Sequence, residues 1–193
     1  AKSFERLLIE RMKKLKIGSP LNPKTDMGPL VNKAALEKVE RYVQIGIDEG
    51  AKLVYGGKRI GKKGFFFEPT LFTKCTADMR ICQEEIFGPV LCLISVKDLD
   101  EAIDVMNSIE YGLSSAIYTR DINKAFIAIE KIEAGLTYVN SSTIGSEVHL
   151  PFGGVKHSGN TREAGIVGIE EFTELKTVYV DYSGRLQKAQ KIE

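Results

Sequence analysis

Apolar residues recur at two spacings along this chain, and the two spacings alternate. Apolar positions three or four residues apart predict helices from Phe4 up to a stop at Gly18 and over residues 32–49, 100–108, 121–134 and 162–172. Short apolar or β-branched runs predict strands over residues 51–55, 89–96, 113–118, 136–139 and 177–182. Strands that alternate with helices are typical of βαβ units. We therefore expect an α/β fold with a largely parallel sheet flanked by helices.

Residues 140–160 interrupt this alternation, because they are too polar and too rich in glycine to form a regular element. A loop of about 20 residues inside a compact domain is usually functional or disordered. Its two histidines, His149 and His157, have no metal-ligand partner at helical or hairpin spacing, so we expect structural roles for both.

Composition narrows the classes of function. The 193 residues suffice for one substantial core, and 43% apolar with 27% charged residues is the balance of a soluble globular protein. A formal net charge of +1 gives no reason to expect nucleic acid or a membrane surface as partner. The cysteines Cys75, Cys82 and Cys92 show no metal-ligand spacing, and Cys92 lies in an apolar run. We expect a reducing, cytoplasmic location and no metal site.

The segment from Gln83 to Val90 carries the most chemical information. It places two adjacent carboxylates, Glu84 and Glu85, and the ring of Phe87 directly before a Gly-Pro pair and a predicted buried strand. Carboxylates at the end of such a strand often face a cleft, where they accept hydrogen bonds from sugar hydroxyls. These residue types alone do not identify the ligand.

Three further segments occur in an order that is informative. They are Gly28-Pro29-Leu30, the stretch from Glu49-Gly50-Ala51 to Gly56-Gly57, and Glu147 to Gly159 followed by Arg162-Glu163-Ala164-Gly165. Together with residues 83–90 they resemble the aldehyde dehydrogenase superfamily over nearly the whole chain. The resemblance implies the catalytic domain of such an enzyme over residues 1–173. It also implies a C-terminal strand and tail over residues 174–193, which in the family joins a sheet shared between subunits.

The resemblance also implies a reaction. Members of this superfamily oxidise an aldehyde to a carboxylate through a cysteine thiohemiacetal, hydride transfer to NAD or NADP, and hydrolysis of a thioester. The segments that carry the nucleophilic cysteine, the general-base glutamate and the cofactor-binding domain lie upstream of the part that matches this chain. None of Cys75, Cys82 and Cys92 stands in the nucleophile motif, so we expect no catalytic residue here and no activity of these 193 residues alone.

The resemblance assigns cofactor roles to two residues. Glu85 matches the glutamate that hydrogen-bonds the nicotinamide ribose, and Phe87 matches the aromatic beside the nicotinamide ring. The alternative for Glu85 is a solvated acid at a helix end, and the alternative for Phe87 is a core residue. Glu84 is expected to have a structural role, in a salt bridge or a helix cap.

Three residues of the long loop match substrate-pocket positions: Phe152, Ser142 and Thr143. For Phe152 the alternative is plain packing under the loop. Residues 147–152, 162–165 and 179–187 are similar to the corresponding segments of a subgroup that acts on 2-oxoglutarate semialdehyde. The implied partners are a small aldehyde, the cofactor-binding domain, and further copies in a homodimer or homotetramer. The rival reading is a truncated, non-catalytic relative that serves as an interaction module through its last strand.

Overall fold

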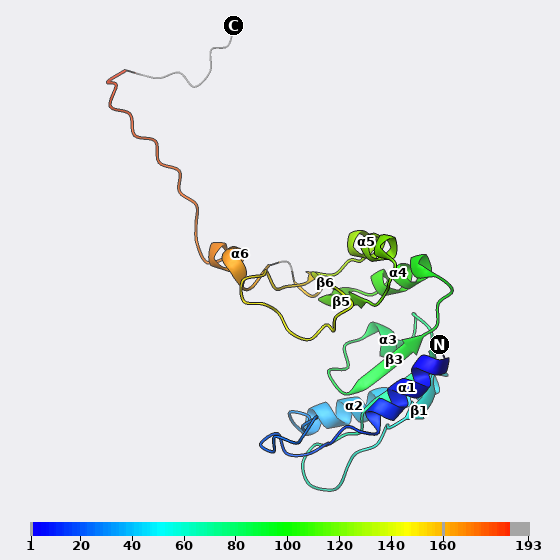
Figure 1. Cartoon of the computed structure of the whole chain (residues 1–193). Coiled ribbons are helices and arrows are strands. Elements are labelled where there is room, and N and C mark those ends of the chain that lie inside the picture. The colour runs from blue at the N-terminus through cyan, green and yellow to red at the C-terminus, as the bar shows by residue number, and fades with distance from the viewer. Residues whose placement is uncertain (1, 160, 186–193) are drawn as a thin grey trace.

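We describe the protein from a computed structural model, which covers residues 2–159 and 161–185 (Figure 1). The helices are α1 (Lys2–Met12), α2 (Lys33–Asp48), α3 (Arg80–Gln83), α4 (Leu99–Asn107), α5 (Ile122–Lys131) and α6 (Gly165–Glu170). The strands are β1 (Lys52–Tyr55), β2 (Thr70–Cys75), β3 (Val90–Ile94), β4 (Tyr111–Gly112), β5 (Ser114–Ile117), β6 (Leu136–Val139) and β7 (Val155–Lys156). In the described part of the chain, no helix combines the length and hydrophobicity that crossing a bilayer requires.

The α/β class is confirmed, but the strands divide among three small sheets instead of one largely parallel sheet. β1, β2 and β3 form a mixed sheet in that order, whereas β5 pairs with β6 and β4 pairs with β7. The pairs β2–β3 and β5–β6 are parallel, while β1–β2 and β4–β7 are antiparallel. Parallel pairing requires a crossover between its strands. α3 lies between β2 and β3 in the chain, and α5 lies between β5 and β6, whereas no helix separates β1 from β2.

The main core lies between α2 and the three-stranded sheet. Asn32 caps α2, because its side-chain oxygen accepts a hydrogen bond from the Ala35 N–H at 2.8 Å. The apolar face of α2 buries Leu36, Val39 and Val43 against β2 and the segments around it. Helical periodicity therefore identified the face of α2 that packs on the sheet.

Strand β2 was not predicted, although it lies at the centre of this sheet. Its sequence, TLFTKC, mixes apolar residues with threonines, which hides the buried run. The structure buries Thr70 completely and satisfies its hydroxyl, which donates to the Glu68 carbonyl at 2.8 Å and accepts from the Gly57 N–H at 2.9 Å. A buried hydroxyl with both partners costs little, so a threonine can occupy a core position here.

The C-terminal part differs from the prediction at two places. α6 begins at Gly165 instead of residue 162, because Glu163 forms an isolated β-bridge with Phe152 and Ala164 has a left-handed backbone (φ 64°). Residues 177–182, predicted as a strand, are extended and pair with no other segment among the described residues. They lead away from the rest of the chain (Figure 1). Pairing of this segment with another chain remains a prediction.

We predict that Gly88→Ala destabilises the protein. A Cβ atom at Gly88 would lie 2.3 Å from Cγ2 of the fully buried Val39, so α2 would have to move away from the strand. Overpacking of this kind costs about 1–3 kcal/mol. The control is Gly28→Ala, whose Cβ would meet only the Pro20 Cβ at 3.8 Å. Urea unfolding of the two variants measures the difference, and equal midpoints would contradict the prediction.

Candidate active-site cleft

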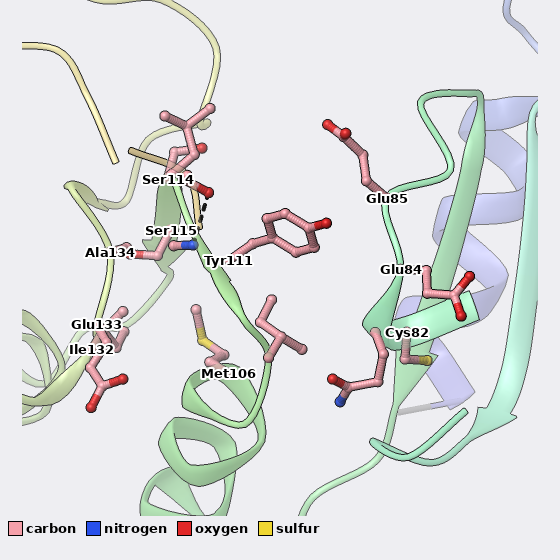
Figure 2. Close-up of a pocket in the computed structure, with 15 residues that line it drawn as sticks. Cys82, Glu84, Glu85, Met106, Tyr111, Ser114, Ser115, Ile132, Glu133 and Ala134 are labelled. Carbon is pink, nitrogen blue, oxygen red and sulfur yellow. Dashed lines mark hydrogen bonds between the residues drawn. The ribbon is translucent and has the colours of Figure 1, made fainter. Parts of the chain in front are cut away.

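A cleft with a volume of about 400 Å³ separates the end of the three-stranded sheet from the β4–β5 region (Figure 2). One wall is residues 82–85, which join α3 to the turn before β3. The opposite wall comprises Met106, Ile109 and residues 111–115, and residues 132–134 and Ser158 complete the lining. The cleft therefore brings together segments that are widely separated in sequence. Residues 111–115 belong largely to β4 and β5, and residues 132–134 precede β6.

Glu85 lies on the first wall and points into the opening, toward the side that carries Tyr111 and Ser114 (Figure 2). We find no hydrogen bond to its carboxylate oxygens from the described residues. Its main chain is held in place, because the Lys38 ammonium donates to the Glu85 carbonyl at 2.6 Å and the adjacent Ile86 is 8% exposed. The main chain at Glu85 is therefore fixed by its neighbours, while the carboxylate accepts no hydrogen bond from the described residues. It can accept hydrogen bonds from a ligand in the cleft.

Glu84, the neighbouring acid, turns away from the cleft (Figure 2). Its oxygens accept hydrogen bonds from the Arg80 guanidinium at 2.8 and 3.1 Å and from the Tyr42 hydroxyl. The contact with Arg80, followed by that with Tyr42, lowers the pKa of Glu84 to about 2. The same contact with Glu84 raises the pKa of the Tyr42 hydroxyl. Glu84 thus joins α3 to α2, which agrees with the structural role expected for it.

Phe87 occupies an unusual backbone conformation. Its φ is 57°, in the left-handed region, and its side chain is 78% exposed. A bulky residue in that region is strained, and such strain is most often found at functional sites. Among the described residues, the Phe87 side chain therefore lies outside the core between α2 and the sheet. Gly88 and Pro89 then return the chain to the sheet, where the Pro89 carbonyl accepts from the Thr70 N–H at 2.8 Å.

The predicted substrate residues lie in the loop after β6. Phe152 is half-buried and paired with Glu163 through two main-chain hydrogen bonds of 2.6 Å. A second cavity, of about 540 Å³, lies between β6 and this loop. Residues 136–138 line it from β6, while the loop contributes Ser141, residues 144–147 and residues 150–151. Ser142 and Thr143 are exposed and line neither cavity. Phe152 also lies outside both linings, directly after Pro151, so the structure does not bring these three residues together with Glu85.

The end of the same loop does reach the cleft. The Ser158 hydroxyl accepts a hydrogen bond from the Gly112 N–H at 3.0 Å, and both residues line the cleft. His157 contacts other side chains of the same region. Its Nδ1 lies 3.3 Å from a Glu110 carboxylate oxygen, and its ring packs edge-on against that of Tyr111, with the ring centroids 6.3 Å apart. Ser158, Tyr111 and Ser114 were missed in the sequence because no motif marks them. Only the pairing of β4 with β7 places Tyr111 and Gly112 beside the loop.

Comparison with known proteins identifies the family. The aldehyde dehydrogenase family model matches residues 1–178. Human retinal dehydrogenase 2 is 45% identical over 177 residues, which cover 92% of this chain and 34% of that protein. Cytosolic 10-formyltetrahydrofolate dehydrogenase of Xenopus tropicalis is 44% identical over 181 residues, which cover 93% of this chain and 20% of that protein.

Solved structures agree. Betaine aldehyde dehydrogenase of Staphylococcus aureus in complex with NAD+ superposes with a TM-score of 0.85 at 39% identity, over 89% of this chain and 35% of that one. The NAD-dependent aldehyde dehydrogenase of Sinorhizobium meliloti superposes with a TM-score of 0.90 at 41% identity, over 96% and 36%. The chain belongs to the aldehyde dehydrogenase family, and it spans about a third of the length of most of these relatives.

We predict that the stabilising contact between Glu84 and Arg80 is lost in acid. The pKa of Glu84 is about 2 in the folded protein against an ordinary value of 4.5. A lowered folded-state pKa adds stability above the unfolded value, and this stability disappears as the pH falls through the folded value. The melting temperatures of the natural protein and Glu84→Gln should therefore differ at pH 5 and converge as the pH falls toward 2. A difference that stays constant over this range would contradict the assignment.

Proposed function

We propose that the protein containing this chain oxidises an aldehyde to a carboxylate with NAD, and that residues 1–173 supply part of its catalytic domain. Membership of the family supports the reaction class, and the NAD+ complex of the staphylococcal relative supports the cofactor. The observation that carries the proposal is the Glu85 carboxylate, held at its main chain and directed into the cleft. NADP in place of NAD, and a cytoplasmic location, remain predictions from the sequence.

The free carboxylate of Glu85 suits a nicotinamide ribose. Two vicinal hydroxyls can each donate to one of its oxygens, and hydrogen bonds to a charged acceptor are stronger than those between neutral groups. Phe87, two residues further on, presents an exposed ring that would lie beside the nicotinamide. When bound, the cofactor accepts the hydride, while the role of these residues is to fix its depth and orientation.

The loop after β6 is proposed to form the substrate side. Phe152 would provide a hydrophobic wall that excludes water from the aldehyde, and Ser142 and Thr143 would contact the substrate directly. Ser142 and Thr143 do not line the cavity next to this loop. To contact a substrate there, the exposed segment that carries them would have to move toward the cavity. A semialdehyde such as 2-oxoglutarate semialdehyde remains the predicted substrate, on the sequence resemblance alone.

We predict that Glu85→Gln weakens NAD binding and slows hydride transfer in the whole enzyme. The amide has the shape of the acid but loses the charge-assisted acceptor, at a cost of about 1.5–3 kcal/mol, or roughly 10- to 150-fold. Glu84→Gln is the matched control, because its side chain faces Arg80 and should change thermal stability instead of NAD affinity. Calorimetric titration with NAD+ gives the affinities, and an unchanged affinity in Glu85→Gln would overturn the role of this residue.

The nucleophile is proposed to come from a segment outside these 193 residues. Cys75 is 5% exposed and therefore inaccessible to an aldehyde. The neighbouring Cys75 sulfur raises the pKa of Cys82 to about 11, so that thiol is a poor source of thiolate near neutral pH. The Cys92 thiol donates to the Ile81 carbonyl at 3.5 Å, and its pKa is raised by the other two sulfurs.

A direct test uses residues 1–193 as an isolated protein. We predict no NADH formation from a panel of aldehydes, since loss of a catalytic nucleophile costs several orders of magnitude in rate. The whole enzyme is the positive control. NADH formation that scales with the pure chain and disappears in Cys82→Ser would contradict the prediction. Inactivity of the whole enzyme as well would favour the rival proposal, an interaction module whose exposed residues 177–182 pair with another subunit.

A further inference from the structure

All three cysteines of the chain meet at one place, which their sequence spacing does not indicate. The Sγ atoms of Cys75, Cys82 and Cys92 all lie within 4.8 Å of one another. They come from three elements: the end of β2, the short helix α3 and the middle of β3. The sequence spacing gave no sign of this cluster, because a strand–helix–strand crossover brings together residues that no spacing rule connects.

A backbone irregularity directs Cys75 into this cluster. The β2–β3 register shifts between Phe72 and Cys75, so that Cys75 pairs with Ile94. The residue between Thr73 and Cys75 is Lys74, which has a left-handed φ of 54°. A shift of this kind changes the direction of the side chains that follow it, and a left-handed non-glycine residue is strained. The fold thus accepts local strain at the residue that sets the direction of the Cys75 thiol.

Burial differs among the three cysteines. Cys75 is buried, whereas Cys82 and Cys92 are partly exposed. The Cys92 thiol donates to the Ile81 carbonyl at 3.5 Å, so this sulfur is also held against the end of α3.

We propose that Cys75, Cys82 and Cys92 bind one thiophilic divalent metal ion, with Zn²⁺ as the expected occupant and water as the fourth ligand. Three sulfurs at the usual zinc–sulfur distance of about 2.3 Å are about 3.8 Å apart in a tetrahedral site. The observed sulfurs need to move by no more than about 1 Å relative to one another to reach this spacing. Binding replaces the thiol protons with the metal and releases them to solvent.

Charge favours a divalent ion over a monovalent one. Three thiolates leave a net charge of −1 around a divalent ion and −2 around Cu⁺, and burial penalises the larger charge. A disulfide is the competing use of these thiols, but it joins two sulfurs and leaves the third unused. The alternative is that the three cysteines are simply small core residues, and this role does not require their sulfurs to lie close together. Convergence of all three sulfurs is what a tridentate metal site requires.

The site would fix the position of α3. Cys82 lies three residues before Glu85, and in Figure 2 its sulfur points away from the cleft, toward the strands. A metal bound to it would tie α3 to both β2 and β3 from behind the wall of the cleft. The binding itself does not depend on the proposed dehydrogenase function, so it can be tested without any activity measurement.

The experiment uses the whole, reduced protein, freed of metal by a chelator, with Co²⁺ as a spectroscopic probe and Zn²⁺ as competitor. We expect a thiolate-to-cobalt charge-transfer absorption that saturates at one equivalent and is bleached by Zn²⁺. Cys82→Ser should weaken Zn²⁺ binding by more than about 100-fold, because even loss of an outer-shell partner costs 10- to 100-fold. Cys82 is the ligand of choice for substitution, since it is only partly buried.

Two controls make the outcome decisive. His149→Ala removes an exposed imidazole outside the cluster and should leave the cobalt spectrum unchanged. Alkylation of the natural protein followed by mass spectrometry should show that Zn²⁺ protects the two partly exposed ligands, Cys82 and Cys92, together. This readout remains available if a serine variant fails to fold. Absence of the charge-transfer band, a band that survives in Cys82→Ser, or alkylation of Cys82 and Cys92 to the same extent with and without Zn²⁺ would each overturn the proposal.

Discussion

The structure depends most on the parallel pairing of β2 with β3 under helix α2. Residues 70–72 of β2 pair with residues 90–92 of β3, and the residues of β2 that form this ladder are fully buried. Each main-chain N–H and C=O group that is removed from water in this way must find a hydrogen-bond partner. The register therefore leaves little freedom to the segment that connects the strands. The Pro89 carbonyl joins the same ladder through Thr70. The preceding turn, with Glu85 and Phe87, is therefore anchored at the end of a rigid strand.

Sequence patterns identified most of the elements whose burial is one-sided. Helix α2 has one apolar face and a polar cap at Asn32, and both signals survive folding unchanged. β6 agrees with the predicted range 136–139, and the parallel β5–β6 pair follows from the helix between its strands. The roles suggested for Glu84 and for His157 also agree with their observed contacts. In each case the information is local, within a few residues of the element that it describes.

Features that depend on contacts between distant segments were not accessible to the same reasoning. β2 is buried on both sides and contains Thr70, whose hydroxyl is satisfied only in the folded chain, so it lacks the alternation of a surface strand. The division of the strands into three sheets depends on which strands pair, and the order of elements along the chain does not specify this pairing. Ser158 reaches the cleft only because β7 pairs with β4. The cysteine cluster likewise exists only in three dimensions, through a register shift that no residue type announces.

The left-handed backbone of Phe87 costs folding stability, and the cofactor contact proposed for its ring is the benefit that would offset this cost. Glycine would adopt a φ of 57° without strain, and asparagine would adopt it at little cost, so either replacement would relieve the main chain. Because the ring is largely exposed, such a change would lose little buried surface. A screen that selects only for thermal tolerance would therefore favour replacing this aromatic early. Such variants would separate the cost of this backbone conformation in folding free energy from the cofactor contact proposed for the ring.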